Sequence, residues 1–143
     1  MLSNTSRYAL RAVIYLASKG SDGERIGIKK IAEDLDIPSP FLGKILQTLA
    51  KKKLLLSTKG PNGGFAFPGD ATTVTLYDII AVIDGEELFT RCLLSDKNCS
   101  EEKEVCAMHN EYHNIRKEIV EMFKGKTILE LAKANKKLEN IIY

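Results

Sequence analysis

The chain lacks any uninterrupted apolar run of the roughly eighteen residues that a membrane-spanning helix requires. It also lacks the apolar core of a signal peptide, because its N-terminal pattern is amphipathic and contains Arg7 and Arg11. Low-complexity tracts and internal repeats are absent, and the composition, 44% hydrophobic and 28% charged, is typical of a soluble globular protein. We therefore expect a cytoplasmic protein with no membrane partner.

Cysteine and histidine are scarce, with three and two residues among 143. An odd number of cysteines confined to one short stretch argues against a disulfide framework. No two of them have the Cys-x-x-Cys spacing of an ordinary zinc knuckle. The roles left for these thiols are core packing, a metal or cluster site, or redox chemistry.

Charge is divided unequally between the two halves of the chain. Residues 1–68 contain 11 Lys or Arg against 5 Asp or Glu, a net charge of +6. Residues 69–143 contain 10 against 14, a net charge of −4. Only the N-terminal half is therefore suited to binding a polyanion such as DNA.

Apolar residues recur at helical spacing in three segments of the N-terminal half. The first runs from about Thr5 to Lys19, and the second, residues 28–35, stops before Pro38. The third has Ser39 as its expected N-cap and Pro40 as its first helical residue. Its expected buried stripe consists of Phe41, Leu42, Ile45, Leu46 and Leu49.

A β-hairpin is predicted after these helices, because two short strand-like runs, residues 54–58 and 65–67, flank a glycine-rich turn. Three helices followed by a hairpin is the element order of a winged helix-turn-helix. In that fold the third helix enters the major groove and the hairpin lies beside it. The predicted fold class is therefore mainly α with a small β-hairpin wing.

The face of the third helix opposite the apolar stripe is the candidate DNA-reading surface. Lys44 and Gln47 can hydrogen bond base edges or phosphates, while Gly43 permits close approach to the groove. The lysines at 51–53 and Lys59 could neutralise phosphates, and the hairpin tip is thin enough for a minor groove. A merely solvated helix face is the alternative. The exposed set comprises Ser39, Pro40, Gly43, Lys44 and Gln47.

The C-terminal half is predicted to be helical with one irregular stretch. A short buried helix at residues 76–83 ends at Asp84 and Gly85, and periodicity is then lost from Glu86 to Glu104. A final helical segment starts at Thr127, a good N-cap. Between them lies a helix with a narrow apolar seam, suited to a helix–helix interface or to ordinary core packing. The seam consists of Met108, Tyr112, Ile115, Ile119 and Met122.

Several segments together resemble the Rrf2 family of bacterial transcription regulators. The glycine-rich wing is the most specific of them, and the likeness covers nearly the whole chain. The segments are Ser6-Arg7-Tyr8-Ala9, Ile31-Ala32, residues 37–42, Lys59-Gly60-Pro61-Asn62-Gly63-Gly64-Phe65, residues 79–85 and Thr90-Arg91-Cys92.

The resemblance implies a homodimer on a roughly palindromic site in double-stranded DNA, with a long helix that crosses to the partner subunit. It implies a winged helix-turn-helix domain at residues 1–70 and a helical dimerisation region at residues 71–143, with a cysteine-containing loop at residues 90–107. The implied DNA contacts extend to Arg7 and Tyr8 and to the wing from Lys59 to Gly64. Because Gly43 replaces the longer polar side chain frequent in the family, base preference cannot be copied from a relative.

The cysteines form a spaced cluster, with six residues between Cys92 and Cys99 and six between Cys99 and Cys106. His109 follows Cys106 at i+3, on the same helix face. Three thiolates and an imidazole can coordinate an iron–sulfur cluster or another soft metal, while direct thiol oxidation and no ligand at all are alternatives.

The cluster-binding branch of the family has three cysteines in this loop, usually one residue closer in each gap, and some members use a histidine three residues after the last cysteine. The resemblance therefore implies an iron–sulfur cluster, two-iron in preference to four-iron, on a stretched version of that motif. The departure leaves the fourth ligand open between His109, His113, Glu102, Glu104 and a residue of the partner's first helix.

Three other functions compete with cluster-dependent regulation. A regulator of the same family could respond to a protein or small-molecule effector without any cluster. A winged helix could also serve only as a protein-interaction module. An enzyme using Cys106 as nucleophile and His109 as base is disfavoured, because no oriented base or oxyanion hole accompanies the pair. We therefore expect no catalytic residues.

Overall fold

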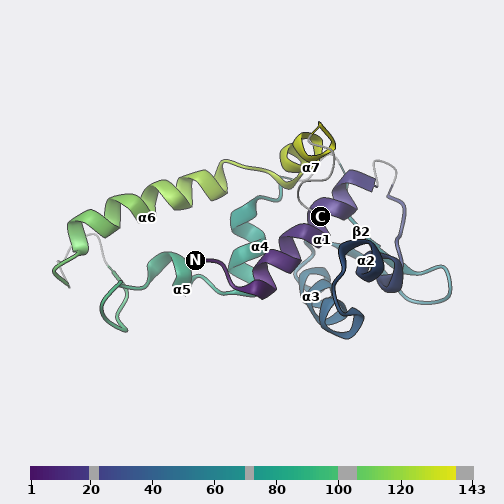
Figure 1. Ribbon diagram of the computed structural model, residues 1–143, viewed down its shortest axis with the longest axis horizontal. Helices are drawn as coiled ribbons and strands as arrows, with labels where there is room; N and C mark the ends of the chain where they lie inside the picture. Colours follow the sequence, from purple (N-terminus) through teal and green to yellow (C-terminus); the bar gives the residue numbers. More distant parts are fainter. Residues whose placement is uncertain (20–22, 70–72, 100–105, 138–143) are drawn as a thin grey trace.

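The computed structural model describes residues 1–19, 23–69, 73–99 and 106–137. Its fold is mainly helical with one two-stranded antiparallel hairpin, which confirms the predicted class. Helices α1 to α3 and the hairpin gather at one end, while α6 extends away at the other (Figure 1). No helix in these ranges is long and apolar enough to cross a membrane. The elements are α1 (Asn4–Lys19), α2 (Ile28–Leu35), α3 (Ser39–Lys51), β1 (Leu56–Thr58), β2 (Gly64–Ala66), α4 (Leu76–Ile83), α5 (Glu87–Thr90), α6 (His109–Lys124) and α7 (Ile128–Lys137).

The turn between α2 and α3 is tight and locally encoded. Asp36 adopts the left-handed conformation, with φ of 52°, which aspartate tolerates better than most residues. The amide of Ile37 then bonds the Ala32 carbonyl at 3.0 Å, closing α2. The N-cap of α3 is Pro38, whose carbonyl accepts from Phe41 and Leu42. Ser39 and Pro40 thus lie one residue further into the helix than the sequence predicted, which corrects that assignment.

The main core is built on the apolar stripe of α3. Leu42, Leu46 and Leu49 are fully buried against side chains of α1 such as Leu16. Phe41 was predicted to belong to this stripe, but it is 39% exposed, and that prediction was wrong. Its position at the edge of the stripe places the ring edge-on to Tyr8 of α1, with centroids 5.8 Å apart. The pair joins the start of α3 to α1.

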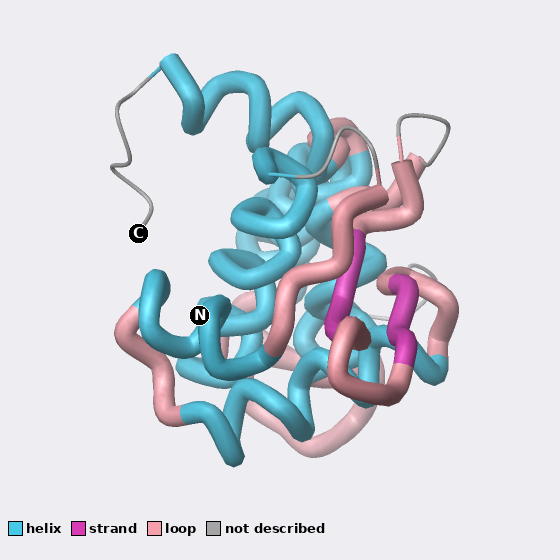
Figure 2. The backbone as a smooth tube through the Cα atoms, turned by 90° about the vertical axis from the view of Figure 1, so that its right-hand side faces the viewer, coloured by secondary structure: helices cyan, strands magenta, loops and turns pink. Residues whose placement is uncertain are grey.

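The hairpin is shorter at its first strand than predicted, and its register pairs Leu56 with Ala66. The preceding residues close α3 instead of extending β1. Lys53 has a φ of 61°, and the amide of Leu54 bonds the Leu49 carbonyl at 3.0 Å. The hairpin projects beside the helices in the rotated view (Figure 2).

A backbone bridge attaches the hairpin to the segment before α2. Ile26 and Phe65 exchange both of their hydrogen bonds at 2.9 Å, so that a short third segment pairs with β2. This pairing was not predicted from the sequence. The bridge fixes the wing to Ile26, which lies just before α2.

The C-terminal helices α4 and α7 start with reciprocal side-chain caps. Thr75 and Asp78 form a capping box at α4, and Thr127 and Glu130 exchange equivalent bonds at α7. Both helices pack against α1, so this half of the chain is anchored to the core. Thr127 was predicted to start the final helix as its N-cap, and its hydrogen bond with Glu130 confirms this.

A second apolar cluster joins α4, the short helix α5 and the C-terminal end of α6. Phe89 of α5 stacks on Tyr77 at 4.6 Å and meets Phe123 of α6 edge-on at 6.0 Å. Residues 86–104 were predicted to be aperiodic, and α5 within them was not expected, because four residues are too few to show a helical period.

Candidate nucleic-acid interface and cysteine site

The exposed face of α3 forms one wall of a shallow hollow of about 400 Å³. Phe65 of the hairpin and Ile28 of α2 form the rest of its lining. A Cβ atom at Gly43 would meet no other atom within 4 Å, so this stretch of α3 is open to an approaching ligand. The structure thus brings together all residues of the α3 face that the sequence singled out as the candidate DNA-reading surface. These are Ser39, Pro40, Gly43, Lys44 and Gln47.

The wing tip requires glycine at two positions for steric reasons. A Cβ atom at Gly63 would lie 2.2 Å from the carbonyl oxygen of Thr58. Gly64 has a φ of +144°, and its Cβ would lie 2.4 Å from the carbonyl oxygen of Ile26. The tight turn leaves the residues from Lys59 to Asn62, with Gly60 and Pro61 between them, fully at the surface.

The N-terminal part of α1 flanks the start of α3. Arg7 is exposed and Tyr8 contacts Phe41. Arg11 donates from Nη2 to the Leu35 carbonyl at 2.6 Å, and its guanidinium carbon lies 6.0 Å from the Tyr8 ring centroid. These contacts fix α1 against the end of α2 and the beginning of α3.

The exposed face of α3 and the hairpin tip together form what we call the α3–wing surface. Its cations are available to a polyanion. In the described ranges neither Lys44 nor Lys59 takes part in an ion pair. Arg25 is a further exposed cation, hydrogen bonded from Nε to the Thr58 hydroxyl at the base of the wing. Sequence reasoning missed Arg25, since its positive charge was its only signal and the bridge beside it was not predicted. Together these side chains make the α3–wing surface cationic.

The first two cysteines lie on a closed turn after α5. The amide of Cys92 bonds the Lys97 carbonyl at 2.9 Å, and that of Cys99 bonds the Thr90 carbonyl at 2.8 Å. This short ladder holds residues 90–92 beside 97–99. Cys92 is buried and Cys99 is half-buried.

The four expected ligands meet at the junction of this turn with the start of α6, in two pairs. Cys99 Sγ lies 3.1 Å from His109 Nδ1. Hydrogen bonds from Ser95, from the Leu94 amide and from Cys106 lower the pKa of the Cys92 thiol to about 7. The bond to Cys92, followed by burial, raises the pKa of Cys106.

The two pairs do not form a single coordination shell. Among the residues that the structure describes, no group of three or more His, Cys, Asp or Glu side chains is arranged to hold one metal ion. His113 stacks on His109 with ring centroids 5.6 Å apart, so it lies beside the site. Glu102 and Glu104, the other expected candidates, lie outside the described residues. The donor set fits a soft metal or an iron–sulfur cluster in chemistry.

The apolar seam of α6 divides into two stripes in the structure. Ile119 packs on the second cluster, and Tyr112 is half-buried. The other members, Met108, Ile115 and Met122, are 41%, 55% and 52% exposed and are spaced seven residues apart.

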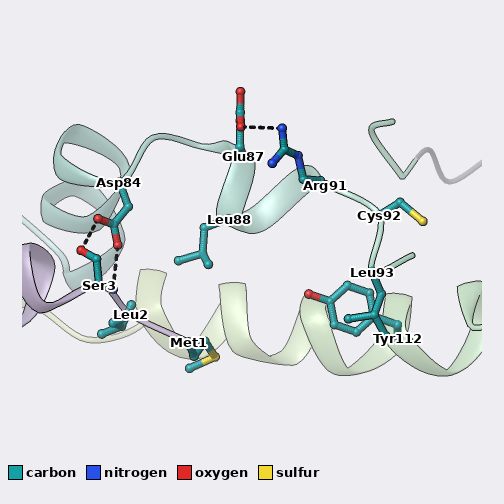
Figure 3. A pocket seen from close by; sticks show the side chains of 10 residues that line it. All are labelled: Met1, Leu2, Ser3, Asp84, Glu87, Leu88, Arg91, Cys92, Leu93 and Tyr112. Atoms are coloured by element: carbon teal, nitrogen blue, oxygen red, sulfur yellow. Dashed lines mark hydrogen bonds and ion pairs between the residues drawn. The ribbon is translucent and has the colours of Figure 1, made fainter. Parts of the chain in front are cut away.

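An open groove of about 590 Å³ lies between α6, α5 and the N-terminus (Figure 3). Met1, Leu2, Leu88, Leu93 and Tyr112 supply its apolar lining. At one end Ser3 binds the carboxylate of Asp84 through its amide and its hydroxyl, which ties the N-terminus to the end of α4. The exposed stripe of α6 and this groove both lie outside the α3–wing surface.

Helices α2 and α3, the tight turn between them and the bridged hairpin define a winged helix-turn-helix, the fold of a DNA-binding regulator. The model of the Rrf2 family, described as an iron-dependent transcriptional regulator, matches residues 2–134. The chain therefore belongs to the Rrf2 family of transcriptional regulators, as its sequence motifs predicted.

Individual relatives agree with this assignment. A protein of Aquifex aeolicus named as an HTH-type transcriptional regulator is 34% identical over 138 residues, 96% of this chain and 94% of that protein. IscR of Yersinia enterocolitica is 26% identical over 91% of this chain and 77% of its own length. The structure of CymR, the global cysteine regulator of B. subtilis, superposes with a TM-score of 0.74 at 26% identity, covering 94% of this chain and 97% of that one. These relatives are named as regulators, a non-enzymatic role, as expected for this chain.

Proposed function

We propose that the protein is a homodimeric regulator that grips palindromic double-stranded DNA through α3 and the wing of each subunit. The observation that carries the proposal is the α3–wing surface. There an open helix face, two lysines that form no ion pair with any described residue and a glycine-dependent hairpin tip lie side by side. Lys44 and Gln47 would contact bases or phosphates. Lys59 would contact phosphates of the DNA backbone where the wing enters the adjacent minor groove. Arg7, Tyr8 and Arg25 would add contacts at the rim.

Dimerisation through α6 is supported by the position of the exposed apolar side chains. Six of the eight large hydrophobic residues exposed in the described ranges lie on the N-terminus, the cysteine turn or α6. A seven-residue spacing is the repeat with which two helices pack along a shared seam. Covering such a surface with a second copy would remove it from water and place two α3 helices on one duplex. The residues are Met1, Leu93, Leu94, Met108, Ile115 and Met122.

Salt dependence tests the DNA-binding proposal directly. We expect the association constant for duplex DNA from upstream of its own gene to fall steeply with salt, with a log–log slope of about −4 or steeper. That slope corresponds to about four or more neutralised phosphates per dimer, and fluorescence anisotropy between 50 and 200 mM salt, a span of about fourfold, measures it. Affinity that is weak and independent of salt would favour a protein-interaction module instead.

The second part of the proposal is that regulation depends on an iron–sulfur cluster held by Cys92, Cys99, Cys106 and His109. A bound cluster would supply redox chemistry and reactivity towards oxidants or nitric oxide. Cys92 and Cys99 belong to the turn after α5, whereas His109 is the first residue of α6 and Cys106 lies three residues before it. If all four side chains held one cluster, the cluster would tie the turn to α6. Loss of the cluster would remove that restraint.

Anaerobic purification tests the cluster. We expect brown protein with visible absorption, iron and acid-labile sulfide, and we expect Cys99→Ala to lose most of this absorption because it removes one donor. Asn98→Ala, at the exposed neighbouring residue, is the matched control and should keep its colour. Colourless anaerobic protein with full operator affinity would instead support the second candidate, a winged-helix repressor controlled by a protein or small-molecule effector.

A further inference from the structure

Arg116 of α6 is a buried cation that pairs with no carboxylate of the described residues. The residue is only 7% exposed. Its Nη1 donates to the carbonyl of Arg91 at 3.1 Å, and Nη2 lies 3.4 Å from His113 Nδ1. No carboxylate in the described ranges forms an ion pair with it, and its remaining charge contact is with the face of the Tyr112 ring, whose centroid lies 5.5 Å from the guanidinium carbon. A guanidinium has five N–H donors, so the two hydrogen bonds leave donors that a ligand could use.

The guanidinium borders a hollow of about 380 Å³ between α5 and α6. Lys117, Lys124 and the His113 imidazole line it as well, against a single carboxylate, that of Glu121. This local excess of positive charge lies in the half of the chain whose net charge is −4. Phe89 and Val120 give the hollow an apolar wall, and Thr90 and Cys99 complete its lining. A cationic hollow of this size with an apolar wall fits a small organic or inorganic anion.

The hollow lies on a different face of α6 from its exposed apolar stripe. Its α6 lining residues are spaced by three and four, as on one face of a helix. At about 100° per residue that face is centred more than 90° from the stripe of Met108, Ile115 and Met122. A second copy packed along the stripe would therefore leave the hollow accessible, a point that rests on the proposed dimer.

We propose that this hollow is a binding site for a small oxyanion, a carboxylate or a phosphate, with Arg116 as its principal ligand. The planar fork of a guanidinium matches two oxygens of either group, and Lys117 and Lys124 would add long-range attraction. Arg116 also holds the carbonyl of Arg91, directly before Cys92. Oxyanion binding would therefore change the contacts between α6 and the cysteine turn.

Calorimetric titration of the full chain without DNA tests the site, with citrate and inorganic phosphate as separate probes at ionic strength kept constant with chloride. We expect saturable binding of at least one probe, and the probe that binds more tightly shows whether the site prefers a carboxylate or a phosphate. Arg116→Gln should weaken that binding by at least about tenfold, because it removes charge-assisted hydrogen bonds. Lys133→Gln, at an exposed lysine of α7 outside the hollow, should leave the affinity unchanged.

Lys117→Gln keeps the test decisive if Arg116→Gln does not fold, because Lys117 is exposed and lines the hollow. It should weaken binding several-fold. The absence of saturable binding for both probes would overturn the proposal, as would an affinity for the bound probe that Lys117→Gln and any folded Arg116→Gln protein leave unchanged. Because the titration contains neither DNA nor iron, this result is separate from the tests of the proposed function.

Discussion

Lys44→Glu and Lys59→Glu are each expected to weaken binding of the cognate duplex by at least about a hundredfold. Each substitution removes one phosphate or base contact and adds a repulsive charge, and in a dimer it does so twice. A loss of about 1.4 kcal/mol per subunit is enough to give this factor. Fluorescence anisotropy at one fixed salt concentration measures the change.

The matched control is Lys133→Glu, which makes the same charge change on α7, away from the α3–wing surface. It should alter affinity by less than about threefold, since it acts only through screened long-range charge. Lys44 and Lys59 are exposed, so their free energies of unfolding should change by less than about 0.5 kcal/mol. Unweakened binding in both Lys44→Glu and Lys59→Glu would show that DNA is bound elsewhere.

Ile115→Glu is expected to convert the dimer into a monomer, with a dimer dissociation constant raised by at least about a hundredfold. Ile115 lies in the middle of the exposed stripe of α6, and in the proposed dimer the substitution buries two unpaired carboxylates. Sedimentation velocity across a concentration series measures the assembly state. Affinity for a full palindrome should fall with it, while the weaker affinity for a single half-site should persist.

Asn114→Glu is the control for Ile115→Glu, because it places the same side chain one residue earlier on α6, about 100° around the helix. The dimer should survive this change. If Ile115→Glu remained dimeric at micromolar concentration, α6 would not be the interface, and the exposed apolar stripe would need another explanation. A monomeric wild-type protein would contradict the proposed assembly outright.

Most helices could be predicted because each has an apolar stripe that packs on a neighbour. Residues 76–83 were predicted with the bounds that the structure gives them, from an apolar run that ends at Asp84 and Gly85. Pairings between distant segments could not be predicted in this way. The bridge between Ile26 and Phe65 depends on backbone hydrogen bonds, to which side-chain periodicity gives no clue. Phe41 was misjudged for a related reason, because its partner Tyr8 belongs to another helix.

In the candidate site, too, local side-chain patterns could be predicted whereas contacts between distant segments could not. The exposed face of α3 could be predicted by elimination, because the core takes the opposite side of the helix. The spacing of the cysteines predicted which residues would gather, but not that Cys99 would face His109 while Cys92 faced Cys106. That arrangement follows from the ladder between residues 90–92 and 97–99, a feature of loop backbone. Arg116 was also unforeseen, because burial of an arginine leaves no mark in the sequence.

Helix α6 is held in different ways at its two ends. Its final turns are fixed by aromatic and aliphatic packing, whereas its first turn contacts the cysteine turn through thiol and imidazole groups. A helix of 16 residues is about 24 Å long, so a tilt of about 5° at the packed end moves the other end by about 2 Å. A change in the contacts of the sulfur atoms would therefore act on the end of α6 that lies farthest from its packed end, where a given tilt of the helix produces the largest displacement.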